Sequence, residues 1–271
     1  MTIDFHTHCY PDKIAEKAVS GLSSTGGIKP YTDGTLRGLS DLMKEQGVRF
    51  FVVNNISADA KRMHNVNDFA ISIDGGNVIS FGSVAPFAEN ATDELERLKE
   101  NGIIGIKFHP YFQDFYVDDP RLASLYDKAR ELGFIVLFHA GSDISFEDTE
   151  RSSPKRLREA AKALGAFDGN DIVLAHWGAS MQSESVISEL CGLPVYFDTA
   201  FGLGYITEEE TSAIVKKHGA SRILFGSDSP WSTPERELSF ISRLGLADDD
   251  LLKIKYKNAF SLLSRHGRNM C

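Results

Sequence analysis

Short apolar runs rich in β-branched residues alternate along the chain with longer segments of helical character. The runs are predicted to be eight strands, at Ile3–His8, Phe50–Asn55, Val78–Pro86, Ile103–Pro110, Phe134–Ala140, Ile172–Trp177, Val195–Thr199 and Ile223–Asp228. Helices are predicted between them, several opening with Pro or Asp, at Asp93–Asn101, Pro120–Leu132, Pro154–Leu164, Glu208–His218 and Glu235–Leu244. Repeated strand–helix units indicate a parallel sheet covered by helices.

The number of units predicts an α/β fold, a single (β/α)8 TIM barrel with room for slight distortion, built as one domain over residues 1–271. A doubly wound open sheet is the alternative, but it normally has fewer parallel strands and a glycine-rich turn after the first one. The sequence shows no such turn there. The Gly21–Gly34 stretch is predicted to be a long first βα loop, either a lid over a site or an ordinary surface loop.

Composition narrows the class of protein. Hydrophobic residues make up 42% of the 271 residues and charged residues 25%, which is typical of a globular protein, and no apolar run is long enough to span a membrane. No signal-peptide pattern precedes Ile3, and the three cysteines are too widely separated to predict a disulfide framework, so a cytoplasmic location is expected. The net charge of −9, without a basic patch, argues against nucleic acid as a partner.

Polar side chains stand at the carboxyl ends of several predicted strands, where a barrel carries its catalytic residues. These are His6, His8, Lys107, His109, His139, His176 and Asp228. His6 and His8 are two residues apart, which places both imidazoles on the same face of a strand, able to bind one ion.

Each of these residues also has an ordinary explanation when it is taken alone. His6 and His8 could be a hydrogen-bonded pair, His139 and His176 could be core histidines with a partner, and Asp228 could cap a helix or a turn. Imidazoles and a carboxylate at four separate strand ends are much harder to explain by packing. Together they indicate a site for zinc or another first-row metal.

The same residues lie in motifs that resemble the amidohydrolase superfamily, in its amidohydrolase-related (amidohydrolase 2) branch of metal-dependent TIM-barrel hydrolases and decarboxylases. The resemblance covers essentially the whole chain and rests on the opening Ile-Asp-Phe-His-Thr-His, on Gly-Ile-Lys-Phe-His-Pro at 105–110, on Phe-Gly-Ser-Asp-Ser-Pro-Trp at 225–231 and on Tyr-Lys-Asn-Ala-Phe at 256–260. It implies that His6, His8, His139 and Asp228 bind one ion. It also implies that His176 acts as an acid, a base or an electrophile.

Lys107 has three alternative roles. With His109 it could bind a substrate carboxylate, or it could pair with an acidic residue inside the barrel. In some members of the superfamily a carboxylated lysine at this strand bridges two metals, and His139 and His176 would then share the second ion. One divalent metal, with Zn²⁺ as the first choice, is the prediction, and a second metal is the alternative.

A metal in this site would activate water, with Asp228 as the proton acceptor and His176 as a donor to the substrate carbonyl. The prediction is hydrolysis of an amide, ester or lactone of a small organic acid. The alternatives are nonoxidative decarboxylation of an aromatic or unsaturated carboxylic acid and, outside enzymology, a non-catalytic metal-binding protein.

The expected partner is a small-molecule substrate, and a homodimer remains open. The candidate substrate-binding residues are Lys107, His109, Trp177 and Tyr111. The first two could bind a substrate carboxylate, and aromatic side chains such as the last two suit a planar substrate.

Overall fold

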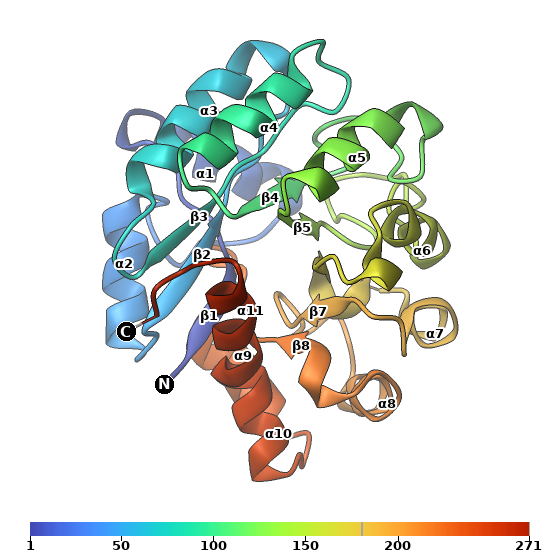
Figure 1. Cartoon of the computed structure of the whole chain (residues 1–271). Coiled ribbons are helices and arrows are strands. Elements are labelled where there is room, and N and C mark those ends of the chain that lie inside the picture. Colours follow the sequence, from blue (N-terminus) through green and yellow to red (C-terminus); the bar gives the residue numbers. More distant parts are fainter. Residues whose placement is uncertain (180, 271) are drawn as a thin grey trace.

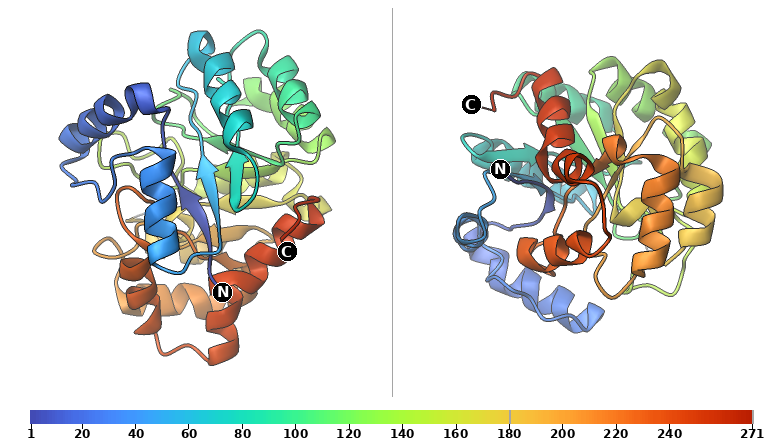
Figure 2. Two further views of the ribbon diagram at one scale, coloured as in Figure 1. Left: turned by 90° about the vertical axis from the view of Figure 1, so that its left-hand side faces the viewer. Right: turned by 90° about the horizontal axis from the view of Figure 1, so that it is seen from below.

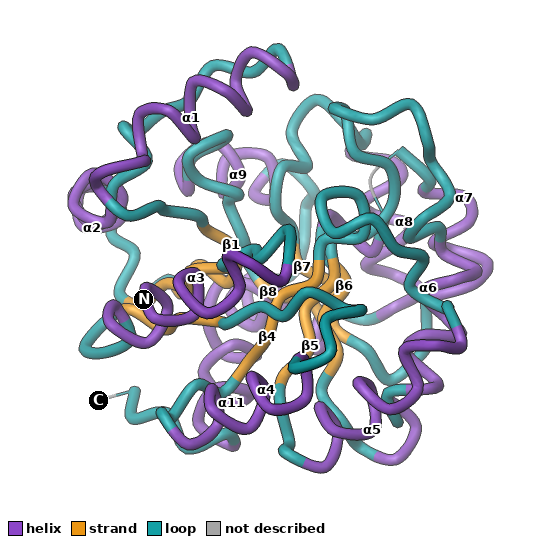
Figure 3. Tube along the Cα trace, turned by 90° about the horizontal axis from the view of Figure 1, so that it is seen from above, coloured by secondary structure: helices purple, strands orange, loops and turns teal. Residues whose placement is uncertain are grey.

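The computed structural model describes residues 1–179 and 181–270. Within these residues eight parallel strands follow one another in chain order around a common axis, and the helices lie outside them (Figure 1, Figure 3). The strands are β1 (Ile3–Thr7), β2 (Phe50–Asn54), β3 (Val78–Phe81), β4 (Gly105–Phe108), β5 (Ile135–Phe138), β6 (Ile172–Leu174), β7 (Tyr196–Asp198) and β8 (Ile223–Leu224). All eight strand predictions are confirmed in position, but the strands end earlier than predicted.

Regular pairing divides the strands into a sheet of β1–β3 and a sheet of β4–β8. Two irregular junctions complete the ring. Between β3 and β4, the backbone N–H of Lys107 donates to the carbonyl of Gly82 at 2.8 Å. Between β8 and β1, the N–H of Asp228 donates to the carbonyl of His6, also at 2.8 Å. The predicted TIM barrel is therefore confirmed, and its slight distortion lies at these two junctions.

The helices of the described chain cover the ring on its outside (Figure 2). They are α1 (Asp12–Gly26), α2 (Leu36–Glu45), α3 (Ala60–Ile73), α4 (Ala91–Glu100), α5 (Ala123–Glu131), α6 (Pro154–Ala163), α7 (Ser183–Ser185), α8 (Glu208–His218), α9 (Pro234–Ser242), α10 (Asp248–Leu252) and α11 (Asn258–Arg265). Helix α8 begins with a capping box, in which Thr207 and Glu210 each accept a hydrogen bond from the other's backbone N–H. No helix of the described residues is long and apolar enough to cross a membrane.

Alternate strand residues fill the inside of the barrel, as the two-residue period of a strand requires. Ile3 and Phe5 of β1 pack there against Ile135 and Leu137 of β5. The inward positions stay apolar at the amino ends of the strands and become polar at the carboxyl ends. The buried Lys107 of β4 marks the change from core to site.

The loop prediction for Gly21–Gly34 was wrong in its first half, because α1 continues to Gly26. Leu22 follows Ile14 and Ala18 at helical spacing, and all three line one cavity. This shared apolar face favours a helix through residues of low helix propensity, since tertiary packing outweighs propensity. The helix ends at Gly27, whose left-handed backbone suits glycine.

Candidate metal centre and active site

A cavity of about 570 Å³ opens at the carboxyl ends of the strands. Most of the predicted site residues line it, namely His6, His8, Lys107, His109, His139, His176 and Asp228. Trp177 and Tyr111 are buried and do not line it. The cavity lining therefore does not include these two residues, and their contact with a substrate stays a prediction.

Three predicted metal ligands converge at the base of this cavity. The Nε2 atoms of His6 and His8 lie 3.2 Å apart. Asp228 Oδ1 lies 3.2 Å from Nε2 of His8 and 3.5 Å from Nε2 of His6. A tetrahedron around zinc, with bonds of about 2.0–2.1 Å, has edges of roughly 3.3 Å. The spacing of these three atoms fits one divalent ion.

The hydrogen bonds of the outer ring nitrogens support the same conclusion. Nδ1 of His8 lies 2.8 Å from the carbonyl oxygen of Asn54, which can only accept, so this nitrogen carries a proton. Nδ1 of His6 lies 2.8 Å from the carboxylate of Asp198. With both Nδ1 atoms donating, the two neutral imidazoles turn their Nε2 lone pairs toward each other and toward a carboxylate. Lone pairs and a carboxylate that face one another repel, and a cation between them would remove this repulsion. The donor set therefore fits a metal.

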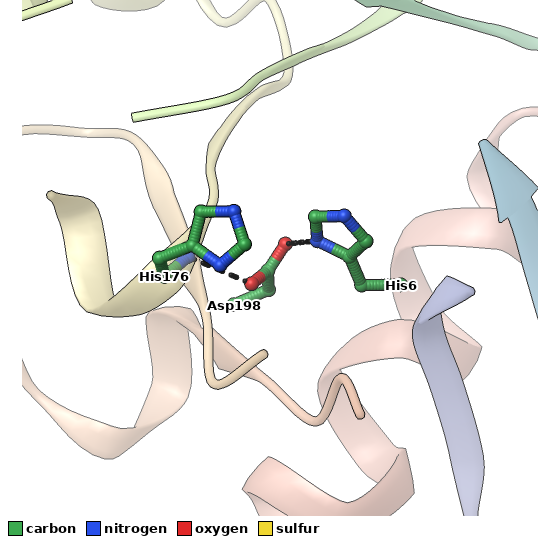
Figure 4. A group of neighbouring side chains, drawn as sticks. All are labelled: His6, His176 and Asp198. Atoms are coloured by element: carbon green, nitrogen blue, oxygen red, sulfur yellow. Dashed lines mark hydrogen bonds and ion pairs between the residues drawn. The ribbon is translucent and has the colours of Figure 1, made fainter. Parts of the chain in front are cut away.

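Asp198 is the main residue that the sequence analysis missed. It ends β7 and is fully buried between His6 and His176 (Figure 4). One carboxylate oxygen meets the ring of His6, and the other accepts the backbone N–H of His176 at 3.0 Å. Its position, directly after the apolar run of a predicted strand, was the signal that could have found it. Asp198 fixes the ring of one candidate ligand and the backbone of the histidine beside it.

His139 and His176 form a second pair next to these ligands. Nδ1 of His176 lies 3.0 Å from the carbonyl of Ala200 and therefore donates, which leaves its Nε2 facing Nδ1 of His139 at 3.0 Å. Nε2 of His139 is buried without a hydrogen-bond partner among the described residues. The structure thus groups His6, His8 and Asp228, and places the predicted fourth ligand, His139, beyond His176. Its role as a ligand stays a prediction.

Lys107 extends into the same group of residues. Its Nζ lies 3.4 Å from Nε2 of His6, and its side chain is buried. Burial lowers the pKa of Lys107 to about 8, against the opposing attraction of Asp198 and Asp228. A cation in this position attracts an anion, which supports the predicted contact of Lys107 with a substrate carboxylate.

Asp228 stays ionised in spite of its burial. Burial alone would raise its pKa, but electrostatic interactions with His6 and His8 and a hydrogen bond with His8 together lower that pKa well below its usual range. The pKa values of His6 and His139 are also well below normal, chiefly because burial disfavours the charged imidazolium form. The site therefore combines neutral imidazoles with a carboxylate, the protonation states that bind a metal.

His109 lies apart from the three converging ligands and stacks on His139, with ring centroids 4.2 Å apart. Its Nε2 lies 3.3 Å from Asp143 in the loop after β5. Burial lowers the pKa of His109 to about 4, although Asp143 opposes this shift. His109 thus joins the loop to the site and lines the cavity beside Lys107, as a substrate-binding residue would.

The backbone is strained where it carries these side chains. His176, Trp177, Phe201 and Asp228 all have positive φ angles, between 53° and 63°, which residues other than glycine rarely adopt. Such strain persists only where the surrounding structure enforces it, and it clusters at functional sites. These four residues lie at the ends of β6, β7 and β8, which bound the cavity.

Comparison with known proteins gave a consistent result for the fold. An uncharacterized TIM-barrel protein from Bordetella bronchiseptica is 18% identical, with a TM-score of 0.77, over 98% of this chain and 99% of that chain. A dihydroxybenzoic acid decarboxylase from Polaromonas sp. JS666, with bound manganese and the inhibitor 2-nitroresorcinol, is 16% identical, with a TM-score of 0.69, over 99% and 98%. A candidate 2-pyrone-4,6-dicarboxylic acid hydrolase from Pseudomonas putida is 16% identical, with a TM-score of 0.64, over 97% of each chain.

The comparison with curated proteins gave no match. The family model described as "Amidohydrolase", however, matches residues 3–265, nearly the whole sequence. This match agrees with the resemblance seen in the strand-end motifs and with the residues that can hold a metal. The chain therefore belongs to the amidohydrolase family of metal-dependent enzymes.

Proposed function

We propose that the chain is a hydrolase that uses a metal-activated water on an amide, ester or lactone of a small organic acid. The observation that carries this proposal is the convergence of His6, His8 and Asp228 on one point at the base of the cavity. One divalent ion, with zinc as the first choice, would bind there, and His139 would be the fourth ligand. Bound there, the ion would activate water and polarise the substrate carbonyl.

Asp228 is the proposed proton acceptor. Its carboxylate is ionised at neutral pH, lines the cavity and lies beside both His6 and His8. It can therefore take a proton from attacking water and later pass it to the leaving group. Its backbone has a positive φ of 63°, which the surrounding structure must enforce.

The hydrogen bonds of His176 support a role for it in proton transfer. Because the carbonyl of Ala200 keeps Nδ1 as a donor, Nε2 of the neutral ring is an acceptor. His176 can donate from Nε2 to a substrate carbonyl only after it takes up a proton. We therefore assign it as an acid/base residue beside the scissile bond, held by Asp198 through its backbone N–H.

Nonoxidative decarboxylation of an aromatic or unsaturated carboxylic acid is the second candidate, and Lys107 is the observation that favours it. A buried ammonium group beside the metal ligands favours a substrate that carries a carboxylate. In that reaction the carboxylate would leave as carbon dioxide, and a proton would replace it on carbon, delivered by His176 or Asp228 after that residue has first taken up a proton from water. The fold is shared with a decarboxylase that acts on 2,6-dihydroxybenzoate, at 15% identity.

The test combines metal analysis with a substrate screen. The purified protein should contain close to one divalent ion per chain, and His6→Ala should lose it, whereas His64→Ala, on the exposed surface of α3, should keep it. Lactones, esters, amides and aromatic carboxylates are then screened with the metal-loaded protein, and acid release and carbon dioxide are followed separately.

Asp228→Asn should retain the fold and lose turnover by about 10²–10⁴-fold. Failure of the unmutated protein to bind zinc or manganese after reconstitution, or full activity of Asp228→Asn, would contradict the proposal. If carbon dioxide is released from an aromatic carboxylate and no acid is released from any ester, amide or lactone, the assigned reaction changes from hydrolysis to decarboxylation.

A further inference from the structure

The cavity is much larger than its polar base, and a second part of it is apolar. From the histidines it extends between α1 and α3, where six side chains line it, Ile14, Ala18, Leu22, Ile28, Val66 and Phe69. We call this part the apolar branch. The whole cavity, about 570 Å³, lies within the roughly 300–1,000 Å³ that is usual for small-molecule sites.

Helix α1 presents a continuous apolar stripe to the apolar branch. Ile14, Ala18 and Leu22 are spaced by four residues and so lie on one face of the helix. A different face, with Ala15 and Val19, is buried against the rest of the protein. The stripe on the cavity side is thus not needed to attach the helix. Ile14 remains 51% exposed and is accessible from the cavity.

Helix α3 forms the other wall in the same way. Val66 and Phe69 lie on the face toward the cavity, while Met63 and Ala70 are buried on the barrel side. Arg62 also lines the cavity, but its side chain is largely exposed and paired with Asp59 at 2.6 Å. The α1 wall of the branch is therefore apolar, whereas α3 adds the polar Asn65 and the already paired Arg62 beside its apolar residues.

The far end of α1 approaches the loop after β5. A Cβ atom added to Gly26 would lie 3.4 Å from the side chain of Ile144 and 3.6 Å from that of Ser145. Gly26, Ile144 and Ser145 all line the cavity as well. The end of α1 and this loop therefore meet at the rim of the apolar branch, whose other end lies at the metal-ligand residues.

We propose that the apolar branch binds an alkyl or arylalkyl extension of the substrate, whose carboxyl group or carboxyl derivative lies at the histidines. The substrate class is therefore an elongated amphipathic acid, ester or amide rather than a compact polar one. The position of the head group rests on the proposed function. The binding of the extension depends only on the residues of the branch.

The test measures binding of 4-n-alkylbenzoates, from the methyl to the butyl compound, to the full-length, manganese-loaded protein by isothermal titration calorimetry. Burial of each methylene should lower the Kd by roughly threefold to fourfold. Ala18→Phe should fill the branch and abolish this dependence on chain length. Ser20→Phe, on the exposed side of the same helix, should keep it.

Unsubstituted benzoate reaches only the base of the cavity, so its Kd should be the same in both variants and the unmutated protein. The proposal is overturned by equal affinity along the series, by failure of every member to bind, or by the same dependence in Ala18→Phe. If the series behaves as expected but no turnover is found, the proposed function fails and this inference stands. If turnover is found on compact substrates and affinity does not depend on chain length, the proposed function stands and this inference fails.

Discussion

Glu237 is a buried carboxylic acid on α9, and replacing it with glutamine should change how stability depends on pH. One of its oxygens accepts the backbone N–H groups of Gly202 and Leu203, at 3.0 and 3.2 Å, and the other meets the hydroxyl of Ser232 at 2.6 Å. It thereby attaches the loop after β7, which carries Phe201 of the cavity wall, to α9. Glutamine can keep these hydrogen bonds, but it has no titratable proton.

Burial raises the pKa of Glu237 from its ordinary 4.5 to about 7, although its three hydrogen bonds oppose the shift. The folded protein therefore keeps the proton up to about pH 7, whereas the unfolded chain loses it near pH 4.5. Stability falls as the pH rises through this interval and is lowest above it. At about 1.36 kcal/mol per pKa unit, the full effect is about 3 kcal/mol, most of which falls between pH 5 and pH 8.

The measurement is urea unfolding at pH 5, 6, 7 and 8, followed by tryptophan fluorescence, for the unmutated protein, Glu237→Gln and Glu235→Gln. Glu235 lies on the exposed side of the same helix and is the matched control. From pH 5 to pH 8, the unfolding free energy of Glu237→Gln should rise relative to that of the unmutated protein by about 2–3 kcal/mol. A constant difference across that range, or the same change in Glu235→Gln, would refute the reasoning.

Asp198→Asn should weaken metal binding by about 10–100-fold, because the carboxylate that orients His6 is lost, as a chelator competition titration would show; an unchanged affinity would remove Asp198 from the metal centre. Gly105→Ala should destabilise the fold by about 1–3 kcal/mol, because the added Cβ would lie 2.4 Å from the ring of Phe81 inside the barrel. Gly21→Ala, with nothing within 4 Å of its Cβ, should instead stabilise α1 by about 0.5–1 kcal/mol, and urea unfolding of both variants should show opposite signs.

Much of the fold could be predicted from the order of the residues. Eight apolar runs alternating with helical segments led to the barrel, because strands buried on both faces leave continuous apolar sequences. The same pattern could not find the end of α1. Gly21 to Gly26 look like a loop by composition, and only the apolar cavity beside Leu22 shows why the segment is helical.

The candidate site divides in a similar way. His6 and His8 could be paired from their two-residue spacing, because the geometry of a strand is local. Asp198 could not be ranked above other strand-end acids, since its contacts are to residues 192 positions away in β1 and 22 positions away at the end of β6. The aromatic residues differ from the histidines. Trp177 and Tyr111 suited a substrate by type, but they are buried and do not belong to the cavity lining, so their contact with a substrate stays a prediction.

The sequence by itself determined the barrel, the family and the chemical types gathered at the strand ends, because each follows from periodicity or from a contiguous motif. Only the tertiary structure decided which nitrogen of each histidine faces its neighbours, that Lys107 lies beside His6, and that an apolar branch leads from the histidines between two helices. These features depend on partners such as the carbonyls of Asn54 and Ala200, which no sequence pattern marks. Backbone groups are the same in every residue, so their positions become informative only when the chain is folded.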